Sequence, residues 1–286
     1  SPLSTLPTDT FRVMNSKGVR AEFTGIRVRY DPEGVAKSNL LGAFVELEPG
    51  ESFTVGHNLA GAYNLSLTGA GVYIVEAANL FRIVEADSTL TDLYADLVPA
   101  QVIVKDKLAF FGNKTIGPTT SRMSKRTSYT GCSPSQQDQV TSAITVAQAY
   151  ARESHTHLEL NPSGSTRYTR WFGTFATNRY NDVLKSFSLL AKSPSEWTYD
   201  CTCQDPKIYA YVNPRNYGTV YLCGYFWAAL PAGAGSKADT IIHEGTHFNQ
   251  ILGTADYAYG QRECLNLART NPANAVYNAD NHAFFS

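Results

Sequence analysis

The stretch His243-Glu244-Gly245-Thr246-His247, followed by Asp256, decides how the C-terminal half of the chain is interpreted. Helical residues four apart lie about 40° apart around the axis and one turn apart along it, so both imidazoles can bind one metal ion. Zinc prefers a tetrahedron of ligands, and a catalytic site leaves one position for water. Gly253 and Thr254 can end the helix and turn the chain back toward the ion. We therefore predict one Zn²⁺ per chain, with His243, His247 and Asp256 as its protein ligands.

Glu244 lies between the two histidines and is the expected general base. In the pattern H-E-x-x-H, the glutamate takes a proton from zinc-bound water, which then attacks a carbonyl group. Such a string also arises by chance as an ordinary polar helix face. Here it is framed by apolar residues, which is typical of a helix with a buried back and a polar cleft face: Ile241, Ile242 and Phe248.

These residues also carry a resemblance to a known family. H-E-x-x-H followed by G-T-x-D-x-x-Y-G over residues 253–260 resembles the signature of the aspzincins, the deuterolysin and peptidyl-Lys metalloendopeptidase family. Further segments are similar to that family and occur in its order: Ser128–Cys132, Arg167–Gly173, Asp200–Cys203, Gly218–Cys223 and Asn278–His282. The resemblance covers about residues 128–286.

The resemblance implies roles for residues beyond the metal-binding helix. Tyr259 matches a tyrosine that donates its hydroxyl to the oxyanion, and His282 is expected to be structural. Asp280 matches an aspartate of the pocket for the residue after the scissile bond, where a carboxylate favours lysine or arginine. Family members carry a second acid three residues further on, where this chain has Ala283. We therefore expect a weaker preference for lysine, or one broadened toward arginine.

All five cysteines lie after residue 131. Cys201 and Cys203 are too closely spaced for most metal-binding knuckles, and such neighbours on a strand point to opposite faces, which favours separate disulfide partners. Four cysteines allow three pairings; the resemblance implies Cys132 with Cys201 and Cys203 with Cys223. Cys264 is left over and is expected to be a buried, unreactive thiol.

Composition excludes several classes of protein. The 286 residues, 43% of them hydrophobic, suffice for two domains with their own cores. A net charge of −1 gives no general attraction to nucleic acid or to an anionic membrane. Apolar runs fall short of a membrane span. The first residues lack the basic and apolar regions of a signal peptide, so a secreted protein would have lost it already.

Residues 1–111 are predicted to form a small all-β, sandwich-like domain. Its candidate strands alternate with Gly- and Pro-containing turns: 19–30, 44–47, 52–55, 63–67 and 72–76. Its lone histidine, His57, is interpreted as structural. Residues 112–127 have the turn formers and dispersed bases of an exposed linker.

Residues 128–286 are predicted to form an α+β, zincin-like catalytic domain. Helical periodicity favours helices at 136–153, 178–190, 237–250 and 260–269, and alternation favours strands at 208–212 and 219–222.

Together these features predict a secreted zinc metalloendopeptidase in zymogen form, acting on proteins or peptides. The resemblance implies an N-terminal propeptide of about this size, which would inhibit as an intramolecular partner until it is cleaved. An enzyme that cuts before basic residues would find bonds at Ser121–Arg122 and Ser124–Lys125. A catalytically idle binding or adhesion protein and a non-proteolytic zinc hydrolase stay open, although the intact Glu244 favours an enzyme over an idle scaffold.

Overall fold

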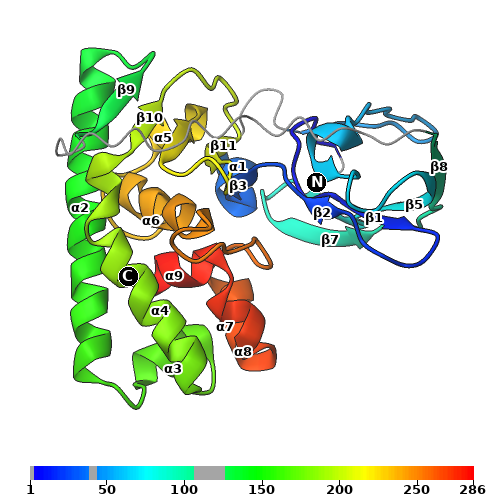
Figure 1. Cartoon of the computed structure of the whole chain (residues 1–286). Helices are drawn as coiled ribbons and strands as arrows, with labels where there is room; N and C mark the ends of the chain where they lie inside the picture. The colour runs from blue at the N-terminus through cyan, green and yellow to red at the C-terminus, as the bar shows by residue number, and fades with distance from the viewer. Residues whose placement is uncertain (1–2, 39–43, 106–125) are drawn as a thin grey trace. The chain divides into compact units, whose positions relative to one another are not determined.

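The computed structural model describes residues 3–38, 44–105 and 126–286, which divide into two compact units (Figure 1). The first unit contains residues 3–26, 32–38 and 44–105. The second contains residues 126–286 together with Arg27–Asp31. This short segment therefore belongs to the C-terminal unit by its contacts, although its neighbours in the chain belong to the other.

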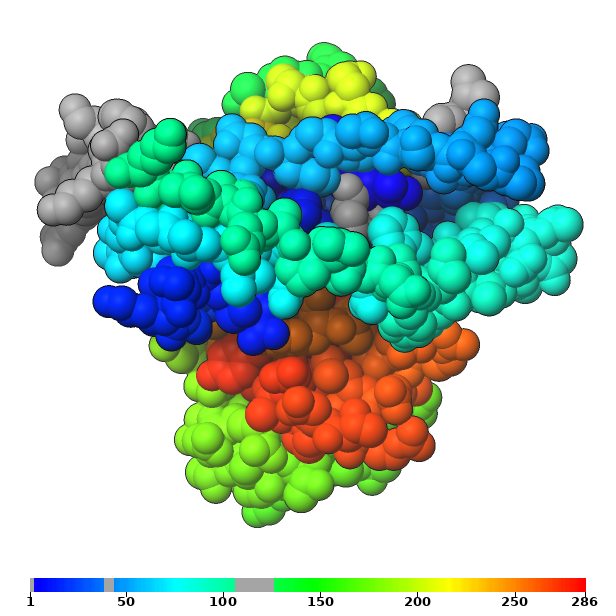
Figure 2. All heavy atoms as spheres, turned by 90° about the vertical axis from the view of Figure 1, so that its right-hand side faces the viewer, coloured from blue at the N-terminus to red at the C-terminus, as the bar shows by residue number. Residues whose placement is uncertain are grey.

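The described residues of the first unit form short antiparallel strands, one α-helix and one 3₁₀-helix. Strand β5 (Gly71–Ala77) pairs with β1 (Phe11–Asn15) and β8 (Ala100–Val104). Two separate pairs accompany this sheet: β2 (Glu22–Phe23) with β4 (Tyr63–Asn64), and β6 (Leu80–Val84) with β7 (Leu90–Tyr94). The two helices are α1 (Pro32–Ser38) and η1 (Leu59–Gly61). Strands β7 and β8, teal to green in Figure 2, contribute exposed apolar side chains to the surface, among them Tyr94 and Ile103.

The first unit differs from the predicted run of strands. The expected strand 19–30 is two strands in different sheets, β2 and β3 (Arg27–Tyr30). The break comes at Gly25, where any side chain would overlap the carbonyl oxygen of Pro7, which accepts a hydrogen bond from Ile26 N. Segments 44–47 and 52–55 form no strand and bury none of their side chains, and residues 32–38, where no helix was predicted, form α1. The first unit is thus not built from strands alone.

A five-stranded sheet lies in the second unit, in the order β3-β11-β12-β10-β9. Its remaining strands are β9 (Ser128–Thr130), β10 (Thr198–Asp200), β11 (Ile208–Val212) and β12 (Thr219–Leu222). Strand β10 is parallel to β9 and β12, whereas β11 is antiparallel to β12. Strand β3 pairs antiparallel with β11 and so forms one edge of the sheet.

Helix α6 (Lys237–His247) is the helix of this unit that carries the H-E-x-x-H residues, and all of its eleven residues are buried. Helix α6 packs against α2 (Pro134–Leu160), α4 (Thr177–Leu190) and α9 (Ala279–Phe285). The others are α3 (Thr166–Phe172), η2 (Ser193–Glu196), α5 (Gly224–Ala228), α7 (Gln261–Thr270) and α8 (Pro272–Val276). Among the described helices, none has the length and apolar character that crossing a membrane requires. The mixed α/β architecture agrees with the α+β class predicted for this part of the chain.

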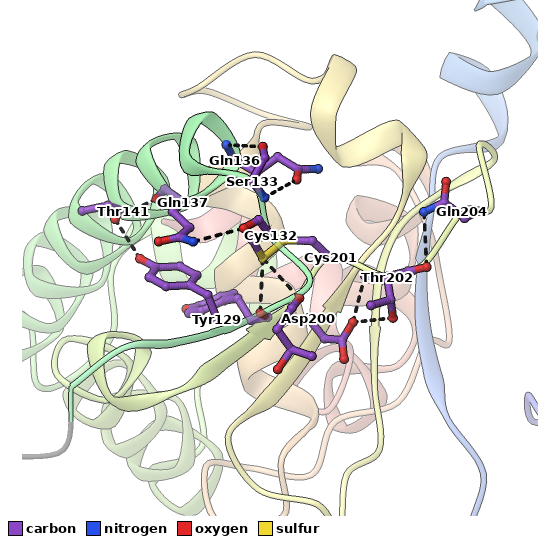
Figure 3. The surroundings of a disulfide bond; sticks show 12 residues. Tyr129, Cys132, Ser133, Gln136, Gln137, Thr141, Asp200, Cys201, Thr202 and Gln204 are labelled. Atoms are coloured by element: carbon purple, nitrogen blue, oxygen red, sulfur yellow. Dashed lines mark hydrogen bonds between the residues drawn. A yellow bond between two sulfur atoms is a disulfide. The ribbon is translucent and has the colours of Figure 1, made fainter.

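Two disulfides fasten the sheet to its surroundings. Cys132 bonds Cys201 and so ties the start of α2 to the end of β10, as Figure 3 shows. Next to this bond, Gln137 Nε2 donates to the Cys132 carbonyl oxygen at 3.1 Å. Cys203 bonds Cys223 at the end of β12. This is the pairing that the resemblance implies, and Cys264 is a buried free thiol.

Candidate active site

Helix α6 presents the H-E-x-x-H residues from the centre of the second unit. Ser236 caps its N-terminus by accepting a hydrogen bond from Asp239 N at 3.1 Å, and His247 is its last residue. Gly245 lets the helix pack closely, because a side chain there would require Leu190 and Trp197 to shift. The fully buried His243, Glu244 and His247 are therefore held by a helix that is itself fixed on all sides.

Three ligand atoms converge beside this helix. The Nε2 atoms of His243 and His247 lie 3.2 Å apart, and Asp256 Oδ1 lies 3.3 and 3.4 Å from them. The other ring nitrogens have their own acceptors: His243 Nδ1 donates to Asp280 Oδ1 at 2.7 Å, and His247 Nδ1 donates to the Thr254 carbonyl oxygen at 3.0 Å. A proton at each Nδ1 leaves the Nε2 lone pairs aimed at one point.

This donor set fits a zinc ion. Ligands about 2.0–2.1 Å from a tetrahedral centre are separated by about 3.3 Å, close to the three separations found here. Two imidazole lone pairs and a carboxylate facing one another would repel without a cation between them. Burial by itself lowers the pKa of His243, but the nearby carboxylates of Asp256 and Asp280 raise that pKa to about 9. The surroundings thus favour positive charge at this point.

Glu244 extends from the same helix with its carboxyl group fully buried. Its Oε1 accepts a hydrogen bond from the backbone N–H of Arg29 at 3.1 Å, and its Oε2 has no hydrogen-bond partner among the described residues. Burial raises the pKa of Glu244 to about 8, against the opposing effect of His243 and Arg29. A carboxyl group with a raised pKa and one unoccupied oxygen is suited to exchange protons.

The segment after α6 returns the chain to the site. Gly253 has a φ of +70°, which glycine adopts without strain, and Ala255 forms a parallel bridge with Asn278. Asp256 and Tyr259 follow this turn. The Tyr259 hydroxyl donates to the Val28 carbonyl oxygen at 2.8 Å. The predicted oxyanion donor therefore already binds a peptide carbonyl group, in strand β3.

Strand β3 also inserts a buried side chain next to α6. Arg29 Nη2 lies 2.6 Å from Asp239 Oδ2, and the two side chains are only 5% and 3% exposed. The Arg29 guanidinium also lies over the Tyr209 ring, 5.2 Å from its centre. Sequence reasoning missed this pair, because 210 residues separate the partners and an acid in the first turn of a helix is normally interpreted as a cap.

Asp280 lies directly behind His243. Its Oδ1 accepts from the His243 ring and its Oδ2 accepts from Gly260 N at 2.8 Å, so each oxygen has a partner. This arrangement orients a metal-binding imidazole, and the predicted role of Asp280 in substrate binding stays a prediction. His282 lies within the core, where its Nε2 donates to the Val276 carbonyl oxygen at 2.8 Å. The predicted processing residues Ser121, Arg122, Ser124 and Lys125 lie outside the described residues.

Comparisons with known proteins show which family the chain is similar to. Residues 157–286 match the family model described as lysine-specific metallo-endopeptidase, or aspzincin. The chain is 41% identical to a peptidyl-Lys metalloendopeptidase of Armillaria mellea over 285 residues, which are 99% of this chain and 79% of that one. It is 32% identical to an extracellular protease of Aeromonas hydrophila, over 84% of this chain and 70% of the relative. The solved zinc peptidase from Grifola frondosa aligns with a TM-score of 0.52 and 42% identity, over 54% of this chain and 95% of that one.

Proposed function

Since this chain belongs to the aspzincin family of zinc metalloendopeptidases, we propose that it is the zymogen of a secreted enzyme and that residues 1 to about 111 inhibit it. The similarity to an extracellular protease supports secretion. The Armillaria relative aligns over almost the whole of this chain, whereas the Grifola structure aligns with about half of it. That contrast supports a precursor that is shortened to the peptidase.

His243, His247 and Asp256 would hold one zinc ion, which supplies a Lewis acid for the carbonyl group and acidifies water. Asp280 and Thr254 fix the two imidazole rings so that both Nε2 atoms face the ion. Glu244 would take the proton of the attacking water at Oε2 and pass it to the nitrogen of the leaving amine. Tyr259 would donate its hydroxyl to the carbonyl oxygen as negative charge develops there.

Strand β3 supports the inhibitory role, because it occupies the groups that a substrate would need. Arg29 N–H is bonded to Glu244, and the Tyr259 hydroxyl is bonded to Val28 O. Strand β3 also covers the edge of β11, where an extended peptide would add as a further antiparallel strand. This double occupancy of base and oxyanion donor is the observation that carries the proposal. A peptide and β3 would compete for the same edge.

The enzyme would prefer lysine or arginine after the scissile bond, because acidic side chains lie beside the candidate catalytic groups. The bonds Ser121–Arg122 and Ser124–Lys125 would then be candidate processing sites for the enzyme itself. Cleavage at either bond would cut the covalent link between the first unit and the peptidase. Strand β3 would then still have to dissociate from its site before a substrate could bind.

The test compares the full chain with its Glu244→Gln variant. The parent should bind zinc, become shorter during incubation and hydrolyse casein as the shortened product appears. The variant should bind the same amount of zinc, stay full length and hydrolyse casein at least about 1,000-fold more slowly. Zinc is measured by elemental analysis and chain length by mass spectrometry.

Each part of the proposal has its own contrary result. Shortening of the variant at the parent's rate would assign processing to another protease. A shortened, zinc-loaded parent without hydrolytic activity would favour the idle binding protein instead.

A further inference from the structure

The peptide bond between Val28 and Arg29 has the contacts expected of a scissile bond. Its carbonyl oxygen accepts from the Tyr259 hydroxyl at 2.8 Å, and its N–H donates to Glu244 Oε1 at 3.1 Å. A substrate needs an oxyanion donor at the first atom and a proton-transferring carboxyl group at the second. Strand β3 is also extended and antiparallel to the sheet edge, as a bound peptide would be. Arg29 therefore stands where the residue after the scissile bond would stand.

The side chain of Arg29 then identifies the pocket for that residue. Its guanidinium pairs with Asp239 at 2.6 Å and lies over the ring of Tyr209. Burial by itself lowers the pKa of Arg29, but Asp239 and Asp280 raise it, so the buried guanidinium stays charged. The pocket is thus acidic, partly aromatic and matched to a long cation.

A role in capping helix α6 would explain why an aspartate is found at position 239, but it explains only some of the contacts of this side chain. It lies in the first turn of α6, and its Oδ2 accepts from Gly235 N at 2.6 Å. However, Ser236 already caps the helix. Capping also works at the surface, whereas a buried carboxylate is strongly destabilising unless a cation pairs with it. Asp239 Oδ1 has no hydrogen-bond partner in the described part of the chain. The buried charge therefore requires a cation, which is Arg29 while β3 is bound.

We propose that Asp239 determines the specificity of the enzyme and that, once β3 has left, its pocket takes the arginine of a substrate cut before that residue. The inference rests on the proposed peptidase function. Hydrolysis adds water across the bond: the carbonyl carbon gains the hydroxyl group and the arginine nitrogen gains the proton. Asp239 supplies a second acid that this chain lacks at Ala283. The planar guanidinium stacks on Tyr209 better than an ammonium does, so arginine is accepted at least as well as lysine.

The experiment uses three peptides that differ only in the residue after one scissile bond, which is arginine, lysine or norleucine. The enzyme is the full chain, cut at a recognition sequence for a specific protease placed at residues 112–127. The ratio of two kcat/KM values is compared between variants, because that ratio does not depend on how much enzyme is still blocked by β3.

Asp239→Asn keeps the size of the side chain and an oxygen for Gly235 N–H, but removes the charge. We expect the arginine-to-norleucine ratio to fall by about 100-fold in this variant, as for loss of one partner of a desolvated ion pair. Asp138→Asn, which neutralises an exposed carboxylate of α2, is the matched control and should leave the ratio unchanged. In the parent, kcat/KM for arginine should equal or exceed that for lysine.

A purely structural Asp239 would give a different result, because all three kcat/KM values would fall by one common factor and the ratio would stay within about twofold. That outcome overturns the proposal, as does a parent that prefers lysine over arginine by tenfold or more. A parent that hydrolyses none of the peptides overturns the peptidase function and the pocket assignment together. Binding gives a readout without turnover: a peptide of residues 24–33 should bind cut Glu244→Gln enzyme at least tenfold more tightly with arginine than with alanine at position 29.

Discussion

Replacing Arg29 with alanine should activate the intact chain. The change leaves the backbone of β3 free to pair with β11 and to donate to Glu244, but it removes the partner of Asp239. An unpaired buried carboxylate remains in the closed state, whereas water reaches it when β3 has left. Truncating one partner of such a pair costs about 2–4 kcal/mol, which corresponds to a factor of about 30 to 900 in the closed-to-open equilibrium.

The assay measures the initial rate at which uncut chain hydrolyses a quenched fluorescent peptide. Gel electrophoresis at each time point verifies that the chain is still full length. Because the rate is proportional to the open fraction while that fraction is small, Arg29→Ala should increase the rate by about the same factor of 30 to 900. Arg29→Lys keeps a cation but loses the planar group over Tyr209, so its rate should rise less than about tenfold.

Arg27→Ala is the matched control for this prediction. It changes the same strand and the same net charge while leaving the pair of Arg29 with Asp239 intact. Equal rates for the parent and Arg29→Ala, with both chains uncut, would show that the Arg29 side chain does not hold the inhibitor in place. Equal activation by Arg27→Ala and Arg29→Ala would attribute the effect to the charge of β3 rather than to the buried pair.

Further predictions concern the metal, the oxyanion and the free thiol. Asp256→Ala should lose zinc to a chelator far faster than Glu244→Gln, because only two protein ligands remain; equal zinc retention would mean that another residue completes the site. Tyr259→Phe should lower kcat of the cut enzyme about 100-fold with little change in KM, and a change confined to KM would contradict the oxyanion role. Burial raises the pKa of the Cys264 thiol, so it should stay protonated and unreactive toward a thiol reagent at pH 8 until the chain is unfolded.

Periodicity predicted the longer elements of the second unit, but not the short ones: α3, α5, α8, α9, β9 and β10. The predicted helix 178–190 is α4 (Thr177–Leu190), and the predicted strands 208–212 and 219–222 are β11 and β12. Only α2 is clearly longer than predicted, since it begins at its capping box and continues to Leu160. In these segments the hydrophobic periodicity of the sequence agrees with the tertiary packing, so the elements can be predicted from the sequence.

The first unit was harder to predict, because its strands are short and its core is small. The run 19–30 alternates like one strand, and only the close crossing at Gly25 separates β2 from β3. The sequence also does not indicate that β3, whose neighbours in the chain belong to the first unit, pairs with the sheet of the second unit. The candidate metal-binding residues are close together in the sequence and were predicted as a set, whereas Arg29 and Asp239 meet only through β3.

The proposed roles of Asp239 would link inhibition to specificity through its pair with Arg29, and a double-mutant cycle measures how far that pair holds β3 in place. If the ion pair holds β3 in place, Arg29→Ala and Asp239→Asn should each increase the activity of the intact chain. The double variant should then be little more active than either single variant. A coupling of about 2–3 kcal/mol is expected, because the two groups lie 2.6 Å apart and are almost completely buried.

The readout of the cycle is the open fraction, obtained by dividing the rate of the uncut chain by that of the same variant after cutting. This division removes any effect of Asp239→Asn on turnover itself, so the cycle reports only on how firmly β3 is held. Additive activation by the two changes would mean that each side chain acts through other partners, and β3 would then be held mainly by its backbone. A coupled result means that Asp239 holds β3 in place through Arg29. Together with a fall in the arginine-to-norleucine ratio of Asp239→Asn, it would mean that one carboxylate both keeps the chain closed and selects the substrate.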